Sequence, residues 1–152
     1  MERKSNASLY VSILALLTSC IAMYVSTCNT DKTLEKSEKG RLNENLNKIE
    51  EINLQYPFVS DSYFIDRWNK NLILNSDSSI RYEAYCEYVF NFFQSVAEFN
   101  RYDKVQIEKF MDVAGLAREH RGWWQRQPKN DSSTEASYPA KFQKLIDSYL
   151  KK

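Results

Sequence analysis

The sequence has little of what β-structure and phosphate-binding loops need. Its 152 residues include three glycines, at positions 40, 115 and 122, and three prolines. An average chain of this length carries roughly ten glycines, and tight hairpin turns depend on residues that adopt positive φ. The composition therefore argues against a β-sandwich, a β-barrel and a glycine-rich phosphate loop. It favours an all-α fold.

Histidine is almost absent. His120 is the single histidine, which excludes a zinc site of the Cys/His type and makes any Ser-His-Asp arrangement depend on one residue. A di-iron bundle would need Glu-x-x-His pairs, but Ala117 stands three residues before His120. We therefore expect no metal, no cofactor and no catalytic residue. An enzyme that uses His120 with a nearby carboxylate is the least favoured alternative.

The chain also lacks a strong excess of charge, because its formal net charge is +1. A strongly basic domain is the usual mark of nucleic-acid binding, so we do not expect a nucleic acid as partner. The charge is unevenly spread: residues 57–100 carry a net −3 and residues 101–152 a net +4. The two halves could attract each other within the domain.

No charged residue occurs between Ser5 and Thr30. The apolar run of residues 9–28 is about 20 residues long, or roughly 30 Å of helix, which matches the hydrocarbon core of a bilayer. Tyr10 and Tyr24 stand near its ends, where interfacial aromatics are common. We expect residues 1–30 to be a transmembrane anchor, with residues 9–28 in contact with the lipid bilayer.

Two alternatives to an anchor remain open. Basic residues followed by an apolar run also resemble a cleaved signal peptide, and residues 17–20 (LTSC) resemble a lipobox in which Cys20 would be acylated. The apolar character continues through residues 21–25, which favours the anchor. Cys28, at the membrane boundary, is a candidate for palmitoylation.

Basic residues that follow the apolar run favour a cytoplasmic C-terminal domain. Lys32, Lys36, Lys39 and Arg41 outnumber the basic residues that precede the run, and cytoplasmic flanks are enriched in Lys and Arg. The isolated Cys86 among aromatic residues suits a free thiol in a reducing compartment.

Residues 31–56 are expected to form a helical stalk or short coiled coil. Leu42, Leu46 and Ile49 have 4-3 spacing, typical of a coiled-coil seam or of a helix that lies on one neighbour. Gly40 is expected to break the helix near its start, and Pro57 to end it.

Residues 57–152 are expected to form a compact bundle of four to five helices. Apolar periodicity predicts helices over residues 60–74, 80–99, 103–123 and 139–150, with a polar loop over residues 125–137. The segment 80–99 is apolar on nearly every side, which predicts that it is the central, buried helix. In the last helix Phe142, Leu145, Ile146 and Tyr149 share one face.

One short segment mixes cations with indoles, and we take it as the candidate binding patch. Such a mixture can bind phospholipid headgroups, RNA or an acidic protein surface. The interpretation that we favour for this segment is structural: the tryptophans fill the bundle and the arginines pair with the acidic half. The candidate residues are Arg118, His120, Arg121, Trp123, Trp124 and Arg126.

Three segments together resemble a loose family of uncharacterised bacterial membrane-anchored helical proteins. The segments are YPF at 56–58 with Trp68, RYEAYCEYVFNFF at 81–93, and HRGWW at 120–124 followed by the helix that ends near Tyr149. The resemblance covers roughly residues 50–150. It implies a bacterial origin and an anchored helical domain, and it transfers no activity.

These observations favour binding over catalysis. We expect a single-pass membrane protein that acts as a tethered interaction module, an adaptor or sensor, with a protein partner or a second copy of itself. The alternative is a membrane effector that self-associates through the small residues Ser12, Ala15, Ser19 and Ala22 and perturbs the bilayer.

Overall fold

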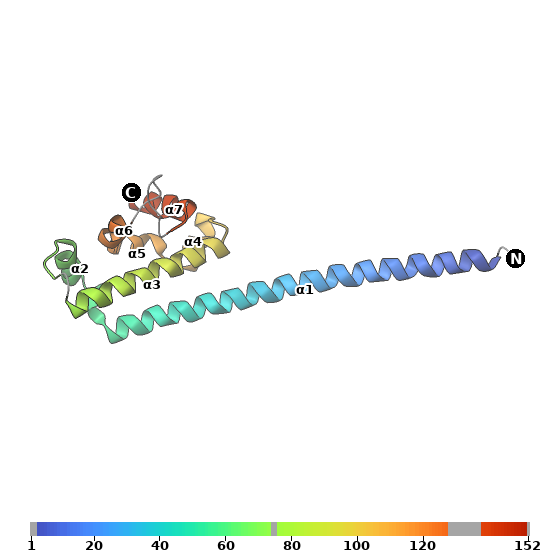
Figure 1. Cartoon of the computed structure of the whole chain (residues 1–152), viewed down its shortest axis with the longest axis horizontal. Helices are drawn as coiled ribbons and strands as arrows, with labels where there is room; N and C mark the ends of the chain where they lie inside the picture. The colour runs from blue at the N-terminus through green and yellow to red at the C-terminus, as the bar shows by residue number, and fades with distance from the viewer. Residues whose placement is uncertain (1–2, 74–75, 128–137, 152) are drawn as a thin grey trace. The chain divides into compact units, whose positions relative to one another are not determined.

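The computed structural model describes residues 3–73, 76–127 and 138–151, and every element in these ranges is helical (Figure 1). The all-α fold class is therefore confirmed. The elements are α1 (Arg3–Gln55), the 3₁₀ turn η1 (Pro57–Ser60), α2 (Ser62–Asn69), α3 (Asp77–Phe99), α4 (Lys104–Phe110), α5 (Val113–Glu119), α6 (Arg121–Arg126) and α7 (Ala140–Leu150).

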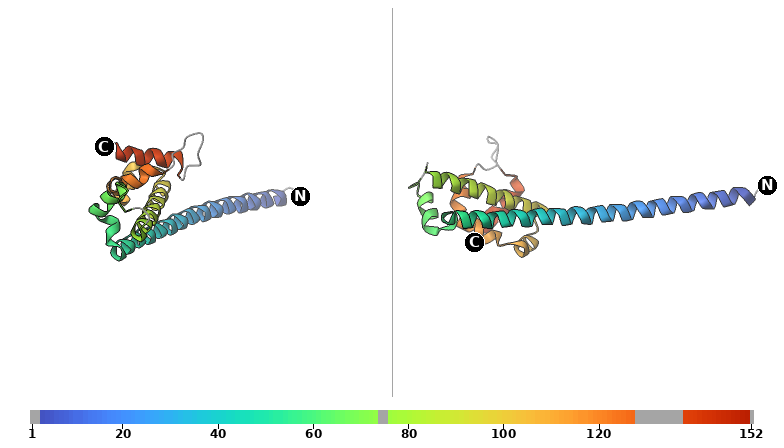
Figure 2. Two further views of the ribbon diagram at one scale, coloured as in Figure 1. Left: turned by 60° about the vertical axis from the view of Figure 1, so that its left-hand side comes forward. Right: turned by 90° about the horizontal axis from the view of Figure 1, so that it is seen from below.

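The chain divides into two units, Met1–Arg41 and Leu42–Lys152. The C-terminal unit begins at Leu42, whereas the sequence pattern placed its start at residue 57. The reason is that Leu42 and Ile49 are buried in the core of this unit, and the Tyr88 hydroxyl donates a hydrogen bond to Asn45 Oδ1 at 3.3 Å. Residues 42–55 are thus part of the domain, where they lie beside α3 (Figure 2).

Gly40 and Pro57 were both predicted to interrupt the helix that became α1, and only Pro57 does so. Gly40 does not interrupt the helix, because one glycine costs only about 1 kcal/mol relative to alanine in a helix that its neighbours favour. Pro57 does act as a stop: α1 ends at Gln55, and Pro57 opens η1.

The N-terminal unit belongs to α1, and the apolar side chains described in it are exposed. Among the described residues, α1 is the only helix long and apolar enough to cross a membrane, and none of its apolar window is buried. Of the side chains described between residues 12 and 41, only Cys28 is half-buried and the rest are exposed. Large apolar side chains are included, such as Leu16 and Ile21.

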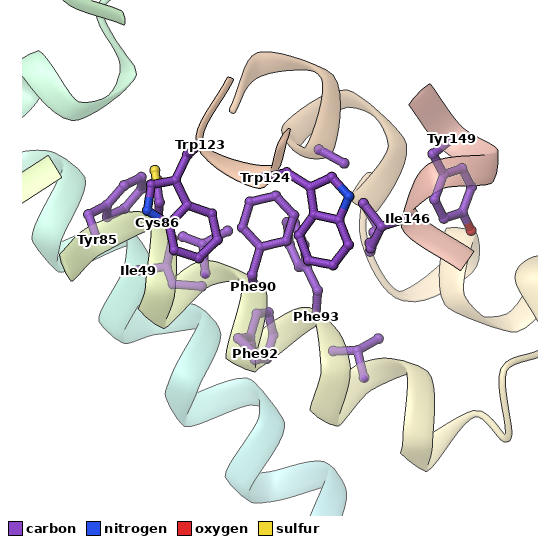
Figure 3. Close-up of a cluster of buried hydrophobic side chains, with 14 of the residues drawn as sticks. Ile49, Tyr85, Cys86, Phe90, Phe92, Phe93, Trp123, Trp124, Ile146 and Tyr149 are labelled. Atoms are coloured by element: carbon purple, nitrogen blue, oxygen red, sulfur yellow. The ribbon is translucent and has the colours of Figure 1, made fainter. Parts of the chain in front are cut away.

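Helix α3 is the centre of the C-terminal unit, as its nearly continuous apolar surface predicted. Its buried face includes Tyr82, Cys86, Val89, Phe90, Phe93 and Val96. The Phe90 ring stacks on both indoles of α6, at 5.1 Å from Trp123 and 5.0 Å from Trp124 between ring centroids (Figure 3). Aromatic stacks of this kind add about 0.5–1.5 kcal/mol beyond the area they bury.

The segment after α3 is more broken than its periodicity predicted. The expectation of one helix over residues 103–123 is wrong, because α4, α5 and α6 are separate. Met111 is extended, and the Asp112 carboxylate accepts a hydrogen bond from the Gly115 amide at 2.7 Å, which caps a new helix start. His120 then separates α5 from α6.

The remaining helices differ from expectation mainly at their ends. The predicted helix 60–74 is shorter, because Asp61 caps α2 at its start and Asn71, with φ of 60°, follows its end. Helix α7 buries Phe142, Leu145, Ile146 and Tyr149, which confirms the predicted face. Of the predicted loop 125–137, residues 125 and 126 belong to α6, and residues 128–137, with Lys129, lie outside the described ranges.

Candidate functional site

The six residues of the candidate patch fall into two groups in the structure. His120, Trp123 and Trp124 are buried in the core, whereas Arg118, Arg121 and Arg126 are exposed. The indoles and the cations therefore do not form one mixed surface. Of the six candidate residues, the three exposed arginines are accessible to a ligand.

The two tryptophans hold the domain together. Besides stacking on Phe90, Trp124 donates a hydrogen bond from Nε1 to Asp147 Oδ1 at 2.8 Å, which joins α6 to α7. The Trp124 indole is also tilted against the Tyr138 ring, at a centroid distance of 5.3 Å, and contacts the Phe142 ring edge-on at 5.8 Å. A buried indole with a satisfied N–H is an efficient core residue, so this part of the patch follows the structural interpretation in which the tryptophans fill the bundle.

His120 is closed off from solvent, with 0 % of its surface exposed. Its Nδ1 lies 3.1 Å from the Tyr82 hydroxyl, and its ring meets Tyr85 edge-on. Its Nε2 is buried and has no hydrogen-bond partner among the described residues. Because burial disfavours the charged ring, the pKa of His120 is lowered to about 4. The ring is therefore neutral at pH 7 and out of reach of a substrate.

The side chains of Tyr82 and Cys86, in the same cluster as His120, are neutral as well. Burial raises the pKa of the Tyr82 hydroxyl and of the Cys86 thiol above their ordinary values. A buried thiol with a raised pKa is a poor nucleophile. This cluster has the properties of a core and not those of an active site.

An open pocket of about 450 Å³ lies on the surface where α2 meets α5 and α6. It contains all three exposed arginines of the patch, which reach it from the end of α5 and from α6. Arg118, Arg121, Gly122 and Gln125 share one side despite the break at His120, because the Trp124 amide still bonds to the His120 carbonyl at 3.2 Å. The lining residues are Asn69, Arg118, Glu119, Arg121, Gly122, Gln125 and Arg126.

Hydrogen bonds and a cation–π contact hold Arg126 in place at the edge of this pocket. Its Nη2 atom donates to the Trp68 carbonyl at 3.3 Å, to the Asn69 carbonyl at 3.1 Å and to Asn71 Oδ1 at 2.8 Å. Its guanidinium carbon lies 3.9 Å from the centroid of the Trp68 ring. The last carbonyls of a helix have no partner within the helix and favour a cation. Arg126 supplies that cation to α2 and ties α2 to α6.

Arg118 and Arg121 are different, because neither forms a hydrogen bond or an ion pair with any other described residue. The carboxyl group between them in sequence belongs to Glu119, whose pKa is raised by desolvation. The predicted pairing of these arginines with the acidic half of the domain is not seen in the described part of the chain. Two cations therefore line the pocket without a partner among the residues that the structure describes.

Gly122 allows the walls of the pocket to come together. A Cβ at this position would overlap the side-chain amide of Asn69. A larger residue at position 122 would require the Asn69 side chain to move out of its present position in the pocket wall. The sequence pattern singled out Arg118, Arg121 and Arg126 but missed Asn69 and Gln125, and no periodicity links Asn69 to residues about 50 positions later.

A second pocket, of about 460 Å³, lies along α3 and contains the carboxylates of Glu83 and Glu87. Residues 127 and 138, which also line it, flank the part of the chain that the structure leaves undescribed. Within the described residues, no group of three His, Cys, Asp or Glu side chains could hold a metal ion.

The two candidate lipidation sites lie in the N-terminal unit. Cys20 is exposed and Cys28 is half-buried, and both thiols are free. Cys86, by contrast, is buried in the core. Only the first two are accessible to an acyl transfer.

Comparison with protein-family models, with curated proteins and with solved structures found no match. The resemblance to uncharacterised bacterial membrane-anchored proteins therefore stays a hypothesis.

Proposed function

We propose that the chain is a single-pass membrane protein whose domain, residues 42–152, is an interaction module that contacts an anionic group of its partner through the arginine pocket. The observation that carries this proposal is the pair of exposed side chains of Arg118 and Arg121, which have no partner among the described residues, beside the fixed Arg126. Arg126 has partners within the fold and stabilises it, whereas Arg118 and Arg121 have none in the described part of the chain and are accessible to a ligand. A tethered adaptor or sensor is the class of protein that this combination fits.

The exposed apolar side chains of α1 support the membrane anchor. A soluble protein rarely leaves a continuous apolar stretch of this size uncovered. We propose that residues 9–28 lie in the bilayer and that the domain is cytoplasmic, as the basic residues after the span favour. Intact mass of the protein extracted from membranes distinguishes this anchor from a signal peptide that is cleaved and from acylation at Cys20 or Cys28.

The interaction proposal is tested by crosslinking in the native membrane. A photoreactive amino acid replaces Gln125, which lines the pocket, in the full-length protein. We expect a crosslinked partner that disappears when Arg118→Glu and Arg121→Glu are combined, because both changes reverse the charge that the partner contacts. Lys144→Glu is the matched control, since Lys144 is exposed on α7 and does not line the pocket.

The circular dichroism spectrum of each variant shows whether the domain is still folded. A partner that crosslinks equally to the double variant would contradict the proposal. The same would follow if the double variant lost its helicity, because the arginines would then stabilise the fold and not a complex.

Self-association in the membrane is the second candidate function. Ala15, Ser19 and Ala22 are exposed on one side of α1, and small residues allow close helix contact. Farther along the helix a shallow groove of about 340 Å³ is lined by Ser26, Asn29, Thr30, Thr33 and Leu34. If only copies of the chain crosslink, if Ala15→Leu with Ala22→Leu abolishes that product, and if overexpression collapses the membrane potential, this candidate replaces the first.

A further inference from the structure

We propose that the arginine pocket binds a phosphate monoester group. This inference rests on the proposed function, because it names the anionic chemistry that the same pocket recognises. It stands on the number and type of the charges around the pocket, on the fixed position of Arg126, and on the size of the pocket.

The charge of the pocket matches that of a phosphate monoester. Among the described residues, three arginines and one carboxylate, that of Glu119, line it, so the formal charge of this described lining is close to +2. A phosphate monoester carries about −1.5 to −2 at neutral pH, whereas a carboxylate, a sulfate monoester or a phosphodiester carries −1. A monoester neutralises the pocket and the singly charged groups leave it positive.

The type of cation also favours a phosphate group as the ligand. Among the described residues that line the pocket, all three cationic side chains are arginines and none is a lysine. The planar guanidinium group donates two parallel hydrogen bonds to a phosphate and stays charged at every physiological pH. The amide groups of Asn69 and Gln125 add neutral donors to the same walls.

Arg126 is already in place before a ligand arrives. Its three hydrogen bonds to α2 and to Asn71 all use Nη2, so Nε and Nη1 form no hydrogen bond with the described residues. A side chain that is already ordered loses little entropy on binding. Arg126 thus provides a fixed point, and Arg118 and Arg121 can close on the anion.

The pocket is larger than one phosphate group. At about 450 Å³ it lies in the range of small-molecule sites, which are roughly 300–1,000 Å³. The remaining volume can accept the organic group that carries the phosphate. A lipid headgroup and a soluble phosphorylated compound share this chemistry.

The test uses full-length protein in phosphatidylcholine nanodiscs, with phenyl phosphate as the probe and isothermal titration calorimetry at pH 7.5 as the readout. We expect saturable binding that is at least tenfold tighter than binding of phenyl sulfate or benzoate, which carry one charge. Combining Arg118→Gln and Arg121→Gln weakens binding of phenyl phosphate at least tenfold. Lys144→Gln, which removes one charge outside the pocket, changes it less than twofold.

Three results would overturn the inference. They are absence of saturable binding of phenyl phosphate, equal affinity for benzoate, and unchanged affinity in the double variant. Circular dichroism of the double variant confirms that it is folded. If it is not, Arg121→Gln alone is measured, and an affinity equal to that of the unmodified protein overturns the inference.

A second set of nanodiscs contains phosphatidic acid, a lipid with a phosphate monoester headgroup. If phosphatidic acid competes with phenyl phosphate, a lipid headgroup supplies the group; if it does not, a soluble compound does. Both results support the inference. If instead partner crosslinking depends on Arg118 and Arg121 while phenyl phosphate does not bind, the proposed function stands and this inference fails. If phenyl phosphate binds but no partner is crosslinked, this inference stands and the proposed function fails.

Discussion

Residues 12–27 of α1 and residues 77–99 of α3 are both apolar helical segments, and they differ in what covers them. On α3, Tyr82, Val89 and Phe90 are fully buried by other parts of the domain. On the N-terminal segment, Met23 is 74 % exposed and Tyr24 is 71 % exposed. A helix with apolar side chains on most of its surface needs apolar surroundings on most sides. The chain supplies them to α3 and does not supply them to residues 12–27.

The two segments also differ in the kind of apolar residue that they contain. The apolar residues of α3 are mainly aromatic, and the large rings reach across a small domain to indoles on α6 (Figure 3). The N-terminal segment combines aliphatic residues with alanine, serine and threonine, and the hydroxyls of Thr18, Ser19 and Thr27 bond to carbonyls of the preceding turn. A hydroxyl satisfied within its own helix can enter lipid at low cost. Aromatic content thus marks the protein core, and satisfied small polar residues are compatible with the bilayer.

Charges placed in the N-terminal segment would have the largest effect. We expect Leu17→Arg combined with Ile21→Arg to disfavour membrane insertion by roughly 6 kcal/mol, because each arginine costs about 3 kcal/mol at the centre of a span. Both positions are exposed on α1. Cell fractionation should move the protein out of the membrane fraction, whereas Leu17→Ala with Ile21→Ala should leave it there. A double-arginine variant that stays in the membrane would show that another feature, such as an acyl chain, anchors the protein.

Removal of one ring from α3 would have the next largest effect. We expect Phe90→Ala to lower the free energy of unfolding of the domain by about 3–5 kcal/mol, because a large fully buried side chain leaves a cavity. Leu16→Ala in the N-terminal segment is the control and should change it by less than about 0.5 kcal/mol. Denaturant titration followed by tryptophan fluorescence measures both. Equal losses in the two variants would mean that protein also covers the N-terminal segment.

The sequence predicts those parts of the structure that repeat with helical period. Helix α3 and the buried face of α7 were predictable because Phe90, Phe93, Leu145 and similar residues recur at helical spacing. The breaks at Met111 and His120 were not, because each depends on a local cap or on packing that overrides an otherwise continuous pattern.

The candidate site was predictable in part for the same reason. Arg118 and Arg121 stand out as cations near a helix end, but their neighbour Asn69 arrives through the tertiary fold. The burial of Trp123 and Trp124 also depends on Phe90, which lies more than 30 residues away in sequence. Residue composition alone cannot decide whether an indole near arginines faces the solvent or the core.

Low pH is expected to destabilise the C-terminal domain through the buried His120. The folded state lowers the pKa of His120 to about 4, while an unfolded histidine titrates near 6.5. The neutral ring therefore stabilises the fold fully above pH 6.5, and this contribution is lost as the pH falls from 6.5 to 4. At about 1.4 kcal/mol per pKa unit, the loss reaches roughly 3 kcal/mol.

We expect His120→Gln to flatten this pH dependence. Glutamine does not titrate in this range and can still bond to the Tyr82 hydroxyl. The nearby Glu119, whose raised pKa acts in the opposite direction, is present in both proteins and cancels in the difference. Free energies of unfolding at pH 7 and pH 4.5 measure the effect, and equal pH slopes in the two proteins would contradict the prediction.

The smallest of the expected effects comes from one hydrogen bond between α2 and α3. Trp68 Nε1 donates to Ser79 Oγ at 3.0 Å, and both side chains are buried. We expect Ser79→Ala to lower the free energy of unfolding by about 1–3 kcal/mol, because the indole N–H is left without an acceptor away from water. Ser95→Ala is the control on the same helix: its hydroxyl bonds only to the Asn91 carbonyl among the described residues, so we expect a change below about 0.5 kcal/mol.

The same substitution tests the arginine pocket. Since Arg126 stacks on Trp68 and bonds to its carbonyl, Ser79→Ala should also loosen the fixed edge of the arginine pocket. A drop in affinity for phenyl phosphate that follows the loss of stability would connect the core of the domain to its site, and an unchanged affinity would show that the bonds of Arg126 to Asn69 and Asn71 are enough to hold it.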